Sequence, residues 1–391
     1  MSQPTGRVLL TGANGFIAAH ILSQLIEHKY YVIATVRSES KAQELIALHP
    51  QWKPHVTFTY VPDLTKEGAY QAAFEVGDVD YVIHAASPTD FSVTDLQEQM
   101  IKPAVEGTVE LLSSAHKYGN SSLKRVVILG SAAAVLDSFE YTVKPRKPYT
   151  ETDWNPITVE HAVKQGNVVL AYCASKTLAE RAAWKYMTDH TPHFDLTVLD
   201  PVTTIGPMLQ PVSGPSNING SNLFDVYSFV AGQHQSVEAA RFPFYHFIDV
   251  RDVARGHILA LTAPAASNKR IILSSGLITP QLVANAIRKN FPDLREKVPE
   301  GTPEAIVPVD THPGDWDTGR SREVFGAGWE CIGLEECVRD AVGSFLEYQE
   351  RCLCAHHHGI YGGRTTDHEG SHITRITVWQ AQEVSSVTSL Q

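Results

Sequence analysis

The chain has 391 residues, of which 43% are hydrophobic, and its formal net charge at pH 7 is −11. A chain of this length can bury a large core, but an acidic one gains nothing from the phosphate attraction that drives nucleic-acid binding. No segment approaches the roughly 18 consecutive apolar residues of a membrane span. The five scattered cysteines fit a reducing compartment without a disulfide framework. We therefore expect a cytoplasmic protein that binds neither nucleic acid nor membrane.

The first half of the chain alternates short apolar segments with longer amphipathic ones. Buried strands are predicted at residues 7–11, 31–36, 56–61, 81–84, 125–129 and 196–199. Helices are predicted at residues 17–28, from near Ser40, at 101–118 and at 167–189. Alternating strands and helices indicate an α/β fold with a doubly wound parallel sheet, as in a Rossmann fold, covered by helices on both faces.

The pattern changes after Pro201. Residues 206–222 are rich in Gly, Pro, Ser and Asn and are interpreted as a loop beside a ligand. Shorter elements follow, with helices at 222–232, 252–262, 280–290 and 334–351 and strands at 247–248 and 270–273. We expect residues 1–200 to form one domain and residues 201–354 a smaller C-terminal lobe, partly interleaved with it. Residues 355–391, with the triplet His356, His357 and His358, are expected to form a flexible tail.

A turn with two glycines joins the first strand to the first helix. It has the sequence TGANGFIA, from Thr11 to Ala18. Gly12 allows a sharp turn, Gly15 leaves room for a pyrophosphate beside the backbone, and Ala18 lets the helix pack on the strand. The unpaired N–H groups at the helix start favour a phosphate, although a turn without a ligand is the alternative. The predicted dinucleotide contacts in this turn are Thr11, Gly12, Asn14, Gly15, Phe16 and Ile17.

The end of the second strand selects between the two nicotinamide dinucleotides. An NAD site usually has Asp or Glu there to bind the ribose 2′-hydroxyl, whereas this chain has Arg37 and reaches its first acid at Glu39. A guanidinium offers planar donors suited to a 2′-phosphate, so we predict that residues 1–200 bind NADP(H). A solvated surface arginine is the alternative. Asp63 and Leu64 are predicted to border the adenine, although Asp63 is equally suited to cap a helix.

Tyr172 and Lys176 lie four residues apart on a predicted helix, so their side chains share one face. The pKa of a free tyrosine is about 10, and a nearby ammonium, with the positive charge of an oxidised nicotinamide, lowers it by favouring the phenolate. Ser131 follows the fifth strand, where its hydroxyl would stabilise a substrate oxygen as charge develops. A Tyr–Lys pair alone occurs by chance in helices. Together with Ser131 and the glycine turn, it predicts one reaction site at the carboxyl ends of the strands.

Seven sequence stretches resemble motifs of the extended short-chain dehydrogenase/reductase family, within the NAD-dependent epimerase/dehydratase superfamily, and they occur in the order expected for that family. They are TGANGFIA at 11–18, VRS at 36–38, HAASP at 84–88, KPAVEGT at 102–108, YCASK at 172–176, DPVTTIGP at 200–207 and FIDVRDVA at 247–254. The likeness covers residues 5–350. It is greatest to the dihydroflavonol-4-reductase-like branch, which includes fungal NADPH-dependent carbonyl and methylglyoxal-type reductases.

The resemblance implies an oxidoreductase that transfers a hydride between NADP(H) and a small-molecule carbonyl or alcohol, a chemistry that also fits secondary metabolism. Tyr172 would supply the proton, Ser131 would hold the oxygen, and Lys176 would lower the tyrosine pKa. Further cofactor contacts are implied for two segments after strands: Ala85, Ala86, Ser87, Pro201, Val202 and Thr203. The implied substrate contacts surround the same centre: Pro88, Thr89, Phe91, Leu136 and Thr204. Whether the protein is a monomer or a homodimer stays open.

The chain departs from the family pattern around the catalytic serine. Gly130 stands where the family often has the first of two serines, so Ser131 is the only hydroxyl at that site. Plant flavonoid reductases carry an asparagine in this region, whereas Ser131 is followed by three alanines, Val135 and Leu136. This difference argues against a flavonoid substrate. Parts of the loop at 208–222, with Phe244 and Tyr245, are further expected to line the substrate pocket.

Other functions share parts of this pattern. A sugar-nucleotide epimerase or dehydratase has the same fold and Tyr–Lys pair, but dehydratases need an acid pair beside the serine, and residues 206–222 lack an arginine for a diphosphate. A non-catalytic NADP-binding redox sensor would usually lack the Tyr–Lys pair. No metal site is expected, because the C-terminal cysteines form no Cys-x-x-Cys pair: Cys331, Cys337, Cys352 and Cys354.

Overall fold

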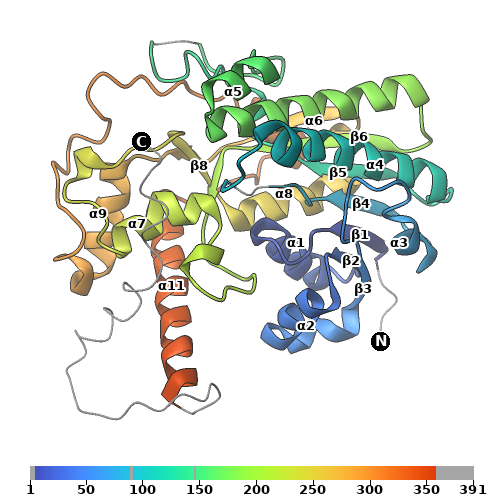
Figure 1. The fold of residues 1–391 in the computed structure, drawn as a ribbon, viewed down its shortest axis with the longest axis horizontal. Coiled ribbons are helices and arrows are strands. Elements are labelled where there is room, and N and C mark those ends of the chain that lie inside the picture. Colours follow the sequence, from blue (N-terminus) through green and yellow to red (C-terminus); the bar gives the residue numbers. More distant parts are fainter. Residues whose placement is uncertain (1–4, 89–90, 145–146, 358–391) are drawn as a thin grey trace.

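The computed structural model describes residues 5–88, 91–144 and 147–357. A seven-stranded parallel sheet with the strand order β3-β2-β1-β4-β5-β6-β9 runs through the molecule (Figure 1). Its strands are β1 (Arg7–Thr11), β2 (Tyr31–Val36), β3 (Val56–Tyr60), β4 (Tyr81–His84), β5 (Arg125–Leu129), β6 (Asp195–Pro201) and β9 (Lys269–Leu273). The predicted α/β fold with a doubly wound parallel sheet is confirmed.

Helices cover both faces of this sheet. α4 and α6 pack together on one face, and α1 and α8 pack together on the other. The side chains of β1 alternate between the two cores, with Val8 and Leu10 on one side and Leu9 on the other. The helices are α1 (Phe16–Glu27), α2 (Glu39–Leu48), α3 (Gln71–Glu75), α4 (Lys102–Tyr118), α5 (Val159–Gln165), α6 (Val168–His190), α7 (Ser228–Val230), α8 (Val250–Thr262), α9 (Pro280–Asn290), α10 (Gly319–Phe325) and α11 (Leu334–His357).

A second, three-stranded sheet begins where the large sheet ends. Its strands are β7 (Thr203–Ile205), β8 (His246–Asp249) and β10 (Gly276–Leu277), in the order β10-β8-β7. β7 follows β6 after a single residue, so the chain passes from one sheet to the other at the carboxyl end of β6. The sequence pattern predicts neither β7 nor β10, because two or three residues carry no readable periodicity.

Two helices differ from their predicted form. The helix predicted at 222–232 begins as a π-helical turn, η5 (Asn222–Tyr227), before α7, and such a turn is too short for its period to be read from sequence. α11 continues to His357, beyond the predicted end at residue 351, because the first glycine after it is Gly359. The predicted tail therefore starts within α11, and the rest of it, from residue 358, lies outside the described residues. None of the described helices combines the length and apolarity needed to cross a membrane.

The strand order reverses beside β1, which pairs with β2 on one side and with β4 on the other. The connections that follow β1 and β4 therefore leave in opposite directions, which opens a crevice at the carboxyl ends of the strands. The TGANGFIA turn, the residues after β4 and the ends of β5 and β6 all lie at this edge.

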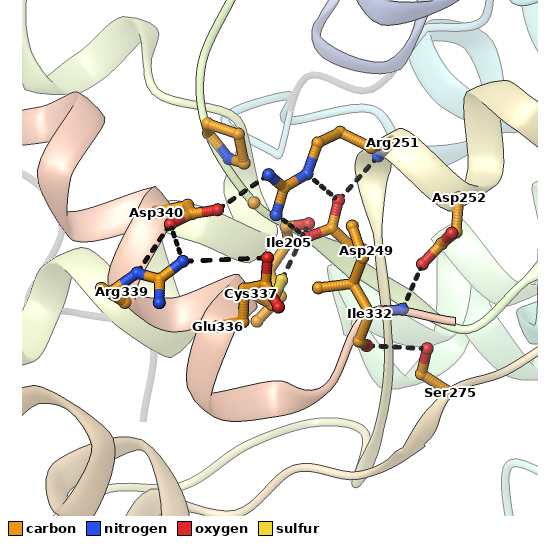
Figure 2. A network of polar contacts seen from close by, with 12 residues as sticks. Ile205, Asp249, Arg251, Asp252, Ser275, Ile332, Glu336, Cys337, Arg339 and Asp340 are labelled. Atoms are coloured by element: carbon orange, nitrogen blue, oxygen red, sulfur yellow. Dashed lines mark hydrogen bonds and ion pairs between the residues drawn. The ribbon is translucent and has the colours of Figure 1, made fainter. Parts of the chain in front are cut away.

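α11 is held to the rest of the protein by an ion-pair network around Arg251 (Figure 2). The guanidinium of Arg251 makes two hydrogen bonds to Asp249, at 2.9 and 2.8 Å, and one to Asp340 of α11, at 2.7 Å. Asp249 is fully buried and also caps α8 by accepting a hydrogen bond from the Arg251 backbone N–H. Nearby, the Cys337 thiol of α11 donates to the Ile205 carbonyl of β7.

Arg251→Met is expected to lower the free energy of unfolding by about 3 kcal/mol, because it leaves the buried Asp249 carboxylate without its partner. Arg339→Met is the matched control, since Arg339 also pairs with Asp340. Its side chain is 49% exposed, so this ion pair contributes below about 1 kcal/mol to the free energy of unfolding. Urea unfolding of the two variants measures both values. Equal losses in the two variants would show that Asp249 does not depend on Arg251.

Candidate active site

A cavity of about 1770 Å³ lies along the carboxyl ends of the large sheet. Single small-molecule pockets usually measure about 300–1,000 Å³, so this one has room for a dinucleotide and a second molecule. One part is lined by the glycine turn and by residues that follow β2, β3 and β4. The other part is lined by residues from η5 and from the segment before β8. Tyr172, Lys176 and Ser131 lie on its wall.

The glycine turn has the geometry of a phosphate cradle. Gly12 has a φ of +66°, and a Cβ placed there would come within 3.0 Å of the Ala86 Cα. A Cβ at Gly15 would come within 3.2 Å of the Gly12 carbonyl oxygen. Gly15 is the N-cap of α1, no side chain caps that helix end, and its first turn contains no acid. The chain therefore presents free backbone N–H groups to the cavity, and these fit a pyrophosphate.

Nearly all the predicted cofactor contacts line the cavity. They are Gly12, Asn14, Gly15, Phe16, Ile17, Arg37, Asp63, Leu64, Ala85, Ala86, Ser87, Pro201, Val202 and Thr203. Thr11 is the exception, because it is fully buried beneath the turn. Its hydroxyl oxygen accepts hydrogen bonds from the backbone N–H groups of Ala85 and Ala86, at 3.1 and 3.0 Å. Thr11 therefore holds the segment after β4 in place and does not line the cavity.

The end of β2 presents a positive charge to the cavity. Arg37 is exposed, and its guanidinium makes no hydrogen bond or ion pair with any residue that the structure describes. Lys41, which also lines the cavity, is paired with Glu44 at 2.8 Å. Asp63 does not cap a helix, since its carboxylate accepts hydrogen bonds from the Thr65 hydroxyl and backbone N–H, which lower its pKa. Arg37 thus remains available for an anion.

Three side chains, two from α6 and one from the segment after β5, meet on the cavity wall. The Tyr172 hydroxyl donates a hydrogen bond to the Ser131 Oγ at 3.3 Å. The Lys176 Nζ lies 5.7 Å from the centre of the Tyr172 ring and donates to the Ser87 Oγ at 3.2 Å. α6 carries both Tyr172 and Lys176, and its start is capped by the side chain of Asn167. The structure therefore brings the three predicted catalytic residues together.

Burial is the main cause of the pKa shifts of Tyr172 and Lys176. It raises the pKa of Tyr172 to about 12 and lowers the pKa of Lys176 to about 8. In the protein without its cofactor, desolvation outweighs the effect of the ammonium, which makes no hydrogen bond to the phenol oxygen. The predicted lowering of the tyrosine pKa also involves the positive charge of an oxidised nicotinamide and stays a prediction. At neutral pH Tyr172 is a neutral phenol that can give up a proton, and Lys176 still carries its charge.

Asp200 is a site residue that sequence reasoning missed. It is fully buried, and its carboxylate accepts a hydrogen bond at 3.0 Å from the Ser131 backbone N–H. A Cβ at Gly130 would overlap this carboxylate and the Val198 side chain. That overlap gives a physical reason for the glycine in place of a serine at position 130. The signal was present in the sequence, because Asp200 opens the stretch DPVTTIGP.

The predicted substrate residues Pro88, Phe91, Leu136 and Thr204 line the cavity, and Thr89 lies outside the described residues. Phe244 lines it as predicted, whereas the buried Tyr245 does not. Sequence reasoning missed several further lining residues, which come from distant segments: Tyr141, Phe224, Asp225, Arg241, His246 and Trp316. For four of them the only sequence signal was proximity to the stretches at 206–222 and 247–254, and Tyr141 and Trp316 had no such signal.

The C-terminal cysteines do not form a described metal site. Cys331 and Cys337 are free thiols, and Cys337 is buried against β7. Among the residues whose side chains are described, no three His, Cys, Asp or Glu side chains are placed to hold a metal ion.

Comparison with known proteins identifies the family. The sequence model of the NAD dependent epimerase/dehydratase family matches residues 8–274, which is more than half of the chain. The chain belongs to this family. The family resemblance predicted from the seven motif stretches is confirmed. The family includes several reactions on one fold, so membership leaves the reaction to be argued from the site.

Members of the family with named activities match almost the whole described chain. A ketoreductase of Aspergillus niger is 35% identical, with 89% of this chain and 99% of that protein covered. An NADPH-dependent methylglyoxal reductase of Saccharomyces cerevisiae is 32% identical, with coverages of 88% and 99%. The crystal structure of yeast methylglyoxal/isovaleraldehyde reductase complexed with NADPH matches with a TM-score of 0.77 at 31% identity, covering 88% of this chain and 99% of that one.

Proposed function

We propose that this protein is an NADPH-dependent reductase of small carbonyl compounds, interconverting a ketone or aldehyde and the corresponding alcohol. The observation that carries the proposal is the contact of Tyr172 with Ser131 on the wall of a cavity that also contains the glycine cradle. The similarity to ketoreductases and NADPH-dependent methylglyoxal reductases supports the same reaction. The five scattered cysteines, which fit a reducing compartment, support a cytoplasmic location.

In this proposal NADPH, when bound, supplies the hydride that reduces the carbonyl carbon. The glycine cradle would hold the pyrophosphate, and Arg37, which is unpaired among the described residues, would hold the 2′-phosphate. The Tyr172 hydroxyl gives its proton to the carbonyl oxygen, so that an alcohol forms and Tyr172 becomes a phenolate. The Ser131 hydroxyl donates to the same oxygen while its charge develops. Lys176 stabilises the phenolate through its positive charge.

The direct test is a panel of aldehydes and ketones with NADPH, followed at the nicotinamide absorbance. Turnover of at least one carbonyl compound, with NADPH preferred over NADH, is the expected result. The panel should include methylglyoxal, because a relative is named for its reduction. Tight NADPH binding without oxidation by any compound would overturn the proposal in favour of a redox sensor.

The pH dependence of the reduction should report the charge of Lys176. Because burial lowers its pKa to about 8, the amine is charged below that pH and loses its charge above it. We expect kcat/KM for reduction to be constant below about pH 8 and to fall above it. Tyr172 does not account for this fall, because its pKa of about 12 lies much higher.

Lys176→Arg tests whether loss of the positive charge at position 176 causes the fall in kcat/KM, since a guanidinium stays charged over the whole pH range. In this variant the fall should move to higher pH even if the maximal rate is lower. A wild-type profile that stays flat well above pH 8 would contradict the assignment to Lys176.

A further inference from the structure

One carboxyl group on the cavity wall makes no hydrogen bond or ion pair with the residues that the structure describes. Asp225 lines the cavity with 2% of its surface exposed. Its Oδ1 is buried and has no hydrogen-bond partner among the described residues. Burial raises the pKa of this carboxyl well above its usual range, with no neighbouring charge to oppose the effect. An unpaired buried polar group destabilises a folded protein, so Asp225 weakens the fold where it stands.

The backbone around Asp225 is fixed by specific hydrogen bonds. The Asn222 side chain, fully buried, accepts from the Gly206 N–H at 3.2 Å and donates to the Gly206 carbonyl at 2.9 Å. The Ser221 hydroxyl donates to the Thr204 carbonyl. These bonds tie the start of η5 to β7 and to the residue that follows it. Asp225 is therefore held at the cavity by a rigid segment, and π-helical turns such as η5 are frequent at functional sites.

An aromatic wall connects Asp225 to the proposed reaction centre. The Phe91 and Tyr172 rings lie 5.6 Å apart between centroids. Phe91 and Phe224 both approach Gly220, since a Cβ there would lie 3.5 Å from one ring and 3.7 Å from the other. Phe224 directly precedes Asp225 in η5. A molecule lying along this wall with its carbonyl at Tyr172 extends toward Asp225.

We propose that Asp225 determines substrate specificity by hydrogen-bonding a hydroxyl group that the substrate carries remote from its carbonyl. This inference rests on the reductase function proposed above and narrows its substrates to hydroxylated carbonyl compounds with an apolar, preferably aromatic, middle part. A neutral hydroxyl is favoured over an ammonium group because Arg241 and Lys176 line the same cavity. A hydroxyl both donates and accepts, so it would satisfy the Asp225 carboxyl in either protonation state.

The test compares hydroxyphenyl butanones, with the hydroxyl at the ortho, meta or para position, with their methyl-substituted counterparts. For the wild type, kcat/KM should be about tenfold higher for at least one hydroxylated isomer than for its counterpart, as one good hydrogen bond provides. Asp225→Leu should abolish this ratio, mainly by raising KM for the hydroxylated isomer. Asp225→Asn should keep part of the ratio.

Thermal unfolding provides a readout that does not depend on activity. Asp225→Leu should unfold at a higher temperature than the wild type, because an unpaired buried carboxyl is replaced by an apolar side chain. Glu323→Leu, an exposed acid on α10 outside the cavity, is the control and should change neither the melting temperature nor the substrate ratio appreciably.

The outcomes separate this inference from the function on which it rests. Turnover with the same ratio in the wild type and Asp225→Leu would overturn the role of Asp225 and leave the reductase standing. A preference for an aminomethyl-substituted ketone over the hydroxylated ones would also overturn it. Failure of every carbonyl compound to oxidise NADPH would instead overturn the reductase function.

Discussion

Tyr172→Phe is expected to lower kcat for carbonyl reduction by about a thousandfold or more, with NADPH affinity nearly unchanged. The substitution removes only the hydroxyl, which lies 3.3 Å from Ser131 and is the proposed proton donor. General acids of this kind contribute about a hundredfold to ten-thousandfold to a rate. Stopped-flow or steady-state rates give kcat, and a fluorescence titration gives the dissociation constant of NADPH. The two measurements together distinguish lost chemistry from lost binding.

Tyr60→Phe is the matched control, because it removes a phenol hydroxyl from a side chain that is 47% exposed and outside the cavity. Its kinetic constants should equal those of the wild type. Tyr172→Phe with more than a tenth of the wild-type kcat would mean that another group delivers the proton.

Arg37→Asp is expected to reverse the cofactor preference. The guanidinium is unpaired among the described residues and lines the cavity, so the 2′-phosphate of NADPH is its proposed partner. Losing charge-assisted hydrogen bonds and adding a repelling carboxylate should lower kcat/KM for NADPH about a hundredfold. The new carboxylate is also suited to the 2′-hydroxyl of NADH. The ratio of kcat/KM for the two cofactors is the measurement.

Arg37→Lys should fall between the wild type and Arg37→Asp, because an ammonium keeps the charge but loses the planar pair of donors. The matched control is Arg7→Asp, since Arg7 lies at the start of β1, far along the strand from the cavity edge. If all the variants keep the wild-type NADPH/NADH ratio, Arg37 does not contact the 2′-phosphate.

The sequence predicted that the residues of the proposed reaction centre lie together, because regular elements place them. Tyr172 and Lys176 share a face of α6, and Ser131 follows β5, so helical spacing and strand order were sufficient to bring them together. The glycine turn was equally readable, since backbone geometry at Gly12 requires the residue that the sequence shows. Thr11 was misplaced because the pattern locates the turn but not which of its side chains face inward.

The part of the cavity lined by η5 and by the segment before β8 was predicted only in part, for a physical reason. Tyr141, Asp225 and Arg241, which were missed, come from segments far apart in the sequence, and no spacing rule connects them. The π-helical form of η5 decides which of its residues face the cavity, and this form has no sequence period that a six-residue segment can display. The electrostatics were also out of reach, because the pKa values of Tyr172 and Lys176 depend on burial rather than on their spacing.

The position of β9 has a consequence for how the protein is made. β9 is the seventh strand of the large sheet in chain order, and it completes the edge beside β6 only when residue 273 has been synthesised. A nascent chain that has emerged as far as β6, which ends at Pro201, therefore exposes an unpaired parallel edge until residues 202–273 have followed at about 5–20 residues per second. During those seconds the edge is open to pairing with other chains. Chaperone dependence and aggregation during expression should consequently respond to changes at β6 and β9 more than to changes at the opposite edge strand, β3.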